Sequence, residues 1–141
     1  MSQSSPQPGA LIVNTEARPR FLRIYATPDG ETHLEERTIS ARSALGPLTG
    51  LRAMSYSPSS VGFHGVNAPM FVINLTGELD VEVSDGTRRR VGPGDLVLLQ
   101  DTTGKGHATK LLGPVTCLFM PVADDFDVKA WAEDNEPGMT S

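Results

Sequence analysis

The chain has 141 residues with 17 acidic and 12 basic side chains, so its formal net charge is −5. This length suits a single domain that buries its own core, and the acidic balance argues against nucleic acid as a partner, because phosphate groups require a basic surface. The chain has a single cysteine, shows no signal-peptide pattern and contains no apolar run near the roughly 18 residues that cross a bilayer. These features favour a cytoplasmic protein without a membrane partner.

In chain order, residues 1–20 are rich in Ser, Gln and Pro and predict a flexible N-terminal arm. Short apolar or alternating segments, separated by turns that contain Gly and Pro, then predict a series of β-strands. The expected strands cover residues 21–26, 32–39, 51–56, 70–75, 79–84, 87–91, 96–100, 107–111 and 115–122. Residues 125–133 have a helical pattern. We therefore expect an all-β barrel over residues 21–123, followed by a short C-terminal helix and tail over residues 124–141.

The turns between these strands carry specific signals. Asp29-Gly30 and Asp85-Gly86 are dipeptides that favour tight β-hairpins, because glycine accepts the positive φ that such turns need. Gly92-Pro93-Gly94 marks a further turn. Short strands joined at this spacing are typical of a β-sandwich or a barrel.

One strand is predicted to form a wall of the barrel interior. Residues 70–75 are an almost continuous apolar run of strand length, which predicts a strand buried on both faces. Side chains alternate between the two faces of a strand. Met70, Val72 and Asn74 would therefore share one face, and the residues between them the other.

Several sequence motifs follow one another in a characteristic order. They are His64-Gly65-Val66-Asn67-Ala68-Pro69, Leu75-Thr76-Gly77-Glu78, Asp85-Gly86, Gly92-Pro93-Gly94-Asp95 and Asp101-Thr102-Thr103-Gly104-Lys105-Gly106-His107. In this order they resemble the small single-domain cupins, and the likeness covers roughly residues 21–122. The resemblance implies a cupin-type double-sheet β-barrel, or jelly roll, whose interior holds the site, and it implies a homodimer.

The resemblance also bears on metal binding. Typical cupins bind a divalent metal through two His and a Glu or Gln from the first motif and a His from the second. His64 and His107 fall on two of these positions, but Val66 and Met70 fall on the other two. Neither Val nor Met holds a hard or borderline divalent ion, and catalytic zinc needs about three protein ligands. We therefore expect neither a metal nor another cofactor.

A barrel interior of this composition suits an apolar, unsaturated small molecule, because methionine adapts to irregular ligands and contacts π-systems. The residues expected to bind this substrate are Met54, Val66, Met70, Val72 and Asn74. The residues expected to be catalytic are Tyr56, His64 and His107. A hydroxyl group and two imidazoles can transfer protons to a carbonyl compound or stabilise it by hydrogen bonds.

The sequence thus predicts a metal-independent enzyme, a cyclase, isomerase or lyase, that holds a flexible intermediate in a reactive conformation. A weaker resemblance to small barrel cyclases of polyketide pathways implies natural-product biosynthesis. Two alternatives stay open. One is a metal-dependent cupin oxygenase or isomerase that uses His64, His107 and Asp101, and the other is a non-catalytic cupin that binds a small molecule.

Overall fold

The computed structural model describes residues 11–12, 14, 16–39 and 48–128, and this part of the chain forms ten strands. They are β1 (Arg20–Ala26), β2 (Thr32–Thr38), β3 (Arg52–Tyr56), β4 (Ser60–His64), β5 (Met70–Thr76), β6 (Leu79–Val83), β7 (Arg88–Val91), β8 (Leu96–Gln100), β9 (His107–Leu111) and β10 (Val115–Pro121). Every predicted strand is present, with ends that differ by at most one residue. The predicted hairpin turns have Gly30 and Gly86 at φ values of +89° and +96°.

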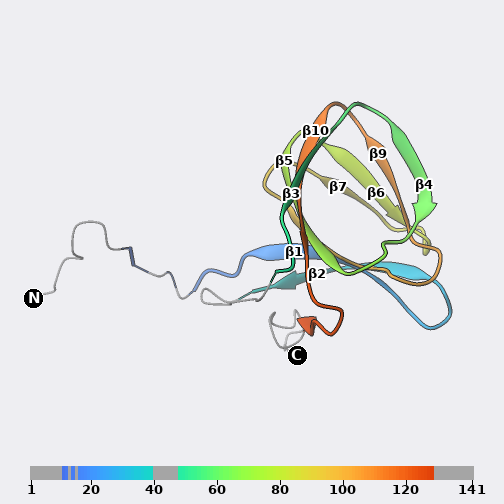
Figure 1. Ribbon diagram of the computed structural model, residues 1–141, viewed down its shortest axis with the longest axis horizontal. Coiled ribbons are helices and arrows are strands. Elements are labelled where there is room, and N and C mark those ends of the chain that lie inside the picture. The colour runs from blue at the N-terminus through green and yellow to red at the C-terminus, as the bar shows by residue number, and fades with distance from the viewer. Residues whose placement is uncertain (1–10, 13, 15, 40–47, 129–141) are drawn as a thin grey trace, which may run out of the picture.

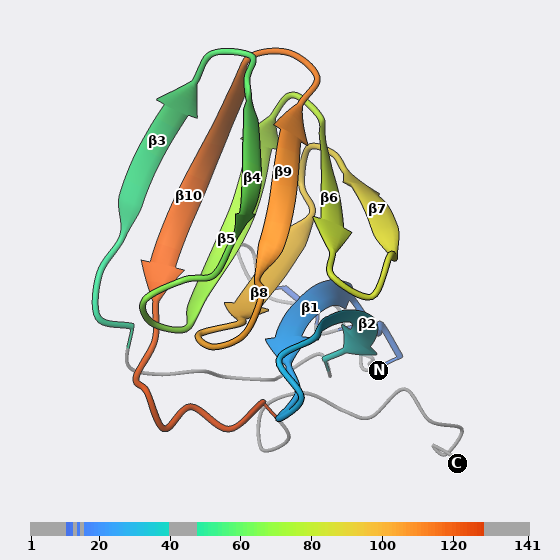
Figure 2. The same ribbon diagram turned by 90° about the vertical axis from the view of Figure 1, so that its right-hand side faces the viewer.

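The strands form two sheets. The six-stranded sheet has the order β2-β1-β8-β5-β10-β3, and the four-stranded sheet has the order β4-β9-β6-β7. The paired strands are antiparallel except β1 and β8, which are parallel. Figures 1 and 2 show the two sheets facing each other and curving around a common interior. This arrangement confirms the predicted all-β, double-sheet fold.

Strand β4 was not predicted from the sequence. All five of its residues are exposed, and Gly62 at its centre supplies no side chain. It lies at the edge of the four-stranded sheet and pairs only with β9. An exposed edge strand needs no alternation of apolar and polar residues, so it lacks the pattern that indicates a strand. This strand nevertheless carries His64.

The apolar residues form two clusters on the two faces of the six-stranded sheet. The larger cluster lies between the sheets and includes Ile24 and Leu99. The smaller cluster, on the other face, includes Phe71 and Val128, and Phe126 packs edge-on against Phe71 with ring centroids 5.7 Å apart. The segment after β10 therefore covers the outer face of this sheet. The predicted helix over residues 125–133 lies largely outside the described residues, as does most of the N-terminal arm.

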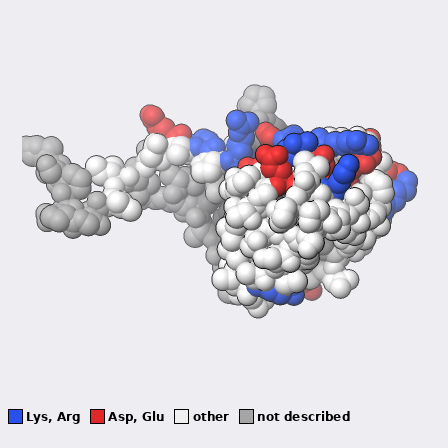
Figure 3. All heavy atoms as spheres, turned by 90° about the horizontal axis from the view of Figure 1, so that it is seen from above, with Lys and Arg blue, Asp and Glu red and all other residues white. Residues whose placement is uncertain are grey.

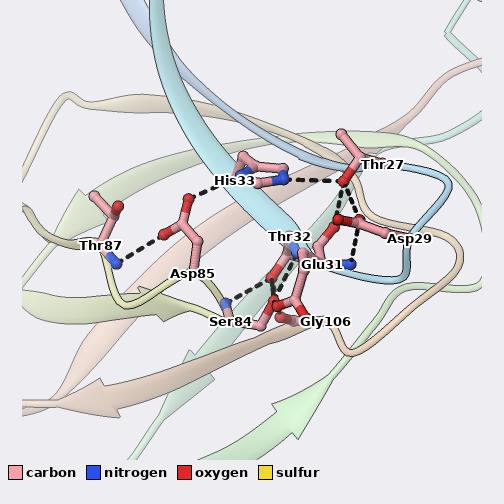
Figure 4. Close-up of polar contacts among 9 residues, drawn as sticks. All are labelled: Thr27, Asp29, Glu31, Thr32, His33, Ser84, Asp85, Thr87 and Gly106. Carbon is pink, nitrogen blue, oxygen red and sulfur yellow. Dashed lines mark hydrogen bonds and ion pairs between the residues drawn. The ribbon is translucent and has the colours of Figure 1, made fainter.

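A buried polar network ties the β1–β2 hairpin to the rest of the barrel (Figure 4). The Thr32 side chain is fully buried. Its hydroxyl donates to the Gly106 carbonyl at 2.6 Å and accepts the backbone N–H of Ser84 at 2.7 Å. Beside it, Nδ1 of His33 lies 2.8 Å from a carboxylate oxygen of Asp85. The network fixes Gly106, which directly precedes the first residue of β9.

Within the described ranges, no helix has the length and apolar character needed to cross a membrane.

Candidate functional site

A cavity of about 370 Å³ lies between the sheets, and side chains from every strand except β2 line it. This volume falls in the range of small-molecule sites. Most of the lining residues are apolar, and they come from the inward face of each strand. The cavity therefore has the size and chemistry of a site for a compact, largely apolar molecule.

The exposure of the lining residues shows where the cavity opens. Ile24, Val91 and Leu99 are at most 8% exposed and form its floor. Tyr56 on β3 and His64 on β4 also line the cavity but are exposed to solvent. Strand β3 is one edge of the six-stranded sheet, and β4 is one edge of the four-stranded sheet. The mouth of the cavity therefore lies beside these two edges.

The structure brings most of the predicted site residues to this cavity. The lining includes Tyr56, His64, Val66, Met70, Val72, Asn74 and His107. Met54 lies between two lining residues of β3 but is not itself among those that line the cavity. Sequence reasoning missed Arg52 and Phe119, which also line it. Arg52 lies two residues before Met54, and the alternation of β3 alone would have placed it on the same face.

The Asn74 side chain is already engaged within the protein. It is 1% exposed, and its Nδ2 donates to the Gly77 carbonyl at 2.8 Å. Its Oδ1 accepts a hydrogen bond from the Cys117 thiol at 3.5 Å. Asn74 thus contributes to the wall and holds the turn after β5.

Cys117 has the structural role that its apolar neighbours in the sequence indicate. Its side chain is buried and forms part of the cavity wall. Burial raises the pKa of the Cys117 thiol, because the thiolate loses its hydration. A protonated, buried thiol is a poor nucleophile, so Cys117 is no candidate for covalent catalysis.

A buried carboxylate holds the side chain of His107 in place at the cavity wall. His107 is 6% exposed, and its Nδ1 lies 2.6 Å from Oδ2 of Asp101, which is fully buried. The carboxylate accepts the Nδ1–H, so Nε2 is the nitrogen left for a ligand in the cavity. A carboxylate in this position fixes the tautomer and stabilises the charge that the ring acquires when Nε2 accepts a proton.

His64 faces His107 from the neighbouring strand. The two residues are paired across β4 and β9, and their ring centroids are 5.0 Å apart. Nδ1 of His64 donates to the Gly62 carbonyl at 2.9 Å, because a carbonyl oxygen only accepts. The Nε2 atom of His64 is therefore also free, and the site contains two imidazoles with available Nε2 atoms.

Two glycines allow these groups to approach so closely. A Cβ atom on Gly65 would lie 2.5 Å from the backbone oxygen of Asp101. A Cβ atom on Gly106 would collide with the backbone of His64, and Gly106 also has a φ of +80°. Any other residue at these positions would push apart the backbone segments that carry His64, Asp101 and His107.

The donor atoms do not fit the metal site that the cupin resemblance implies. Asp101 lies behind His107 on its Nδ1 rather than beside the two Nε2 atoms. Val66 and Met70 line the cavity where two further ligands would be expected. In the described part of the chain, no three or more His, Cys, Asp and Glu side chains are grouped so that they could hold a metal ion. A ligand set of His64, His107 and Asp101 is therefore not supported.

The structure is similar to solved β-proteins of low sequence identity. A cupin superfamily protein from Desulfitobacterium hafniense is 16% identical, with a TM-score of 0.44 over 88% of this chain and 95% of that chain. A DUF861 family protein from Thermotoga maritima is 21% identical, with a TM-score of 0.45 over 50% of this chain and 77% of that one. Hydroquinone 1,2-dioxygenase from a Sphingomonas species, with 4-hydroxybenzoate bound, is 13% identical, with a TM-score of 0.40 over 61% and 68% of the two chains.

At these identities the similarity concerns the fold alone. No protein-family model matches the chain, and no curated protein matches it.

Proposed function

We propose that the chain is a metal-independent enzyme that binds an apolar, unsaturated small molecule in the barrel and catalyses its cyclisation or isomerisation by proton transfer. The observation that carries this proposal is the buried His107–Asp101 pair at the wall of an apolar cavity. A conjugated, polyketide-like intermediate with carbonyl groups has the required chemistry.

In the proposed reaction, His107 acts as the general base. Its Nε2 removes a proton from a carbon next to a substrate carbonyl, and the electron pair of the C–H bond forms an enolate. Asp101 stabilises the resulting imidazolium. The Tyr56 hydroxyl at the mouth can donate a hydrogen bond to the enolate oxygen.

The enolate then has two outcomes. In an isomerisation, the proton returns from the imidazolium to a different carbon of the conjugated system. In a cyclisation, the enolate carbon attacks a second carbonyl of the same molecule, and the new alkoxide takes the proton. His64 is the second group within reach of such a proton, because its free Nε2 lies on the neighbouring ring.

The apolar floor contributes by restricting the substrate. The walls that include Val72, Met70 and Leu99 hold the carbon chain in few conformations. Holding reacting groups together in this way supplies part of the rate acceleration before any proton moves. The proposal therefore requires both the shape of the cavity and the histidine pair.

Two neutral probes test the proposal. One is a β,γ-unsaturated cyclohexenone, which isomerises to the conjugated enone, and the other is a linear methyl diketone whose aldol closure and dehydration give a methylcyclohexenone. Both products absorb in the ultraviolet. The wild-type protein should accelerate at least one reaction, and His107→Gln should abolish most of this acceleration. His33→Gln is the matched control, because His33 does not line the cavity.

Three results would contradict the proposal. A His107→Gln variant as active as the wild type would remove the general base. A rate that falls with chelator and returns with added metal would show a metal enzyme. Binding of both probes without any turnover would assign the cavity to a non-catalytic binding protein.

A further inference from the structure

Arg52 has an unusual position for a charged residue. It lies on the edge strand β3 and lines the mouth of the cavity. In the register of β3 and β10 it is opposite Phe119, and its guanidinium carbon lies 5.5 Å from the centroid of the Phe119 ring. The aromatic face holds the flat guanidinium group, and the N–H groups at its edge remain available.

Arg52 also differs from the other arginines of the strands. Each of those has a carboxylate partner: Arg20–Glu36, Arg23–Glu35, Arg37–Glu35, Arg88–Glu82, Arg89–Glu36 and Arg90–Asp80. Figure 3 shows basic and acidic side chains interleaved along one side of the molecule. Among the described residues no hydrogen bond or ion pair engages Arg52. No Asp or Glu is among the residues that line the cavity.

We propose that Arg52 binds a carboxylate group of the substrate, so that the substrate class is an apolar, unsaturated carboxylic acid. This inference rests on the proposed function, because it concerns the same cavity. A guanidinium group matches a carboxylate with two parallel N–H···O bonds. The protein has a net charge of −5 and repels anions in general, so a bound anion needs a local cation such as Arg52.

The position of Arg52 also orients the substrate. The carboxylate would stay at the solvent-exposed mouth, where its desolvation is small, and the apolar part would extend toward the floor. Arg52 belongs to the six-stranded sheet, and His64 and His107 belong to the four-stranded sheet. The anchored end would therefore lie on one wall, while the histidines act on the carbon chain from the other wall.

The experiment compares cinnamate with cinnamamide, which share an unsaturated apolar part and differ in charge. Titration calorimetry should show that wild-type protein binds cinnamate about tenfold more tightly, the order expected for a charge-assisted hydrogen bond. Arg52→Met should remove this preference and leave the affinity for cinnamamide unchanged. Arg52→Lys should keep part of it, because a lysine retains the charge without the planar fork.

Arg88→Met is the matched control. It removes the same charge from β7, and Arg88 does not line the cavity. This variant should keep the preference for cinnamate. If it loses the preference as Arg52→Met does, the effect comes from net charge, and the proposal is overturned.

Other results would also overturn the inference. Equal wild-type affinity for the two probes, no binding of either probe, or unchanged cinnamate binding by Arg52→Met would each exclude a carboxylate anchor. The neutral cyclohexenone carries no carboxylate. Its turnover by the wild-type protein would therefore support the proposed function even if the carboxylate anchor at Arg52 is excluded.

Discussion

Replacement of Asp101 by Asn tests the proposed catalytic pair directly. Asn has nearly the same shape as Asp, and its amide oxygen can still accept the Nδ1–H of His107. The variant therefore keeps the hydrogen bond that orients the ring and removes the charge that stabilises the imidazolium. Because the Asp101 side chain is fully buried, solvent screens this charge only weakly.

The size of the effect follows from the change in the type of hydrogen bond. A bond to a charged group contributes about 1.5–3 kcal/mol and a neutral bond about 0.5–1.5 kcal/mol. The loss of about 1–1.5 kcal/mol from the transition state lowers the rate roughly tenfold, since about 1.4 kcal/mol corresponds to one factor of ten. The loss is larger if the amide turns and donates to Nδ1, because the proton of His107 then occupies Nε2.

The assay is the isomerisation rate of the neutral cyclohexenone at pH 7, measured for Asp101→Asn and for Asp80→Asn. Asp80 lies on β6 and pairs with Arg90, so its replacement removes the same charge away from the cavity. Thermal unfolding establishes that both variants are folded. A folded Asp101→Asn variant with the wild-type rate refutes the role assigned to the pair.

Three further outcomes are expected. Thr32→Val removes the hydrogen bonds that the buried Thr32 hydroxyl makes with Gly106 and Ser84. It should lower the free energy of unfolding by about 2–4 kcal/mol, measured by urea denaturation, and Thr32→Ser should lose much less. Hydrogen bonds from Thr87 hold the pKa of Asp85 below its ordinary value of 3.8. Ionised Asp85 therefore stabilises the fold above pH 3.8, and this stabilisation is lost as the pH falls through the lower pKa of the folded state. Asp85→Asn should therefore flatten the acid limb of stability against pH, and an unchanged limb would contradict this. Met70→Glu adds a carboxylate beside the two cavity histidines and should increase zinc uptake in elemental analysis; no gain would show that Met70 does not occupy a ligand position.

The strands and turns could be predicted because each has a local cause. Alternation along β6, the apolar run of β5 and the glycines of the hairpin turns depend on neighbours in the sequence. The faces of β5 followed for the same reason: Met70 and Val72 line the cavity, and Phe71 packs in the cluster on the opposite face. Strand β4 lacked such a pattern, because an exposed edge strand has no apolar face to bury.

The arrangement of the site depends on long-range contacts that no local pattern reveals. The sequence indicated His64 and His107, but the place of Asp101 behind His107 depends on the geometry of the loop between β8 and β9. The availability of Arg52 depends on which carboxylates the other strands bring to the other arginines. A sequence shows the donors and acceptors, but it does not show which of them are already paired.

The buried carboxylate of Asp101 is the strongest argument for a chemical role of the site. Among the described residues, Oδ1 of Asp101 has no hydrogen-bond partner, although the side chain is fully buried. An unpaired buried oxygen costs free energy, and a neutral side chain would tie the loop to His107 at a lower cost.

The same carboxylate–imidazole arrangement orients histidine ligands in metal sites, but here the cavity wall includes the apolar side chains of Val66 and Met70. What the pair retains is the ability to hold a proton beside an apolar wall. An enolate formed there would be stabilised by the imidazolium. A substrate carboxylate held by Arg52 at the mouth would keep the second negative charge on the opposite wall, where it opposes this stabilisation least.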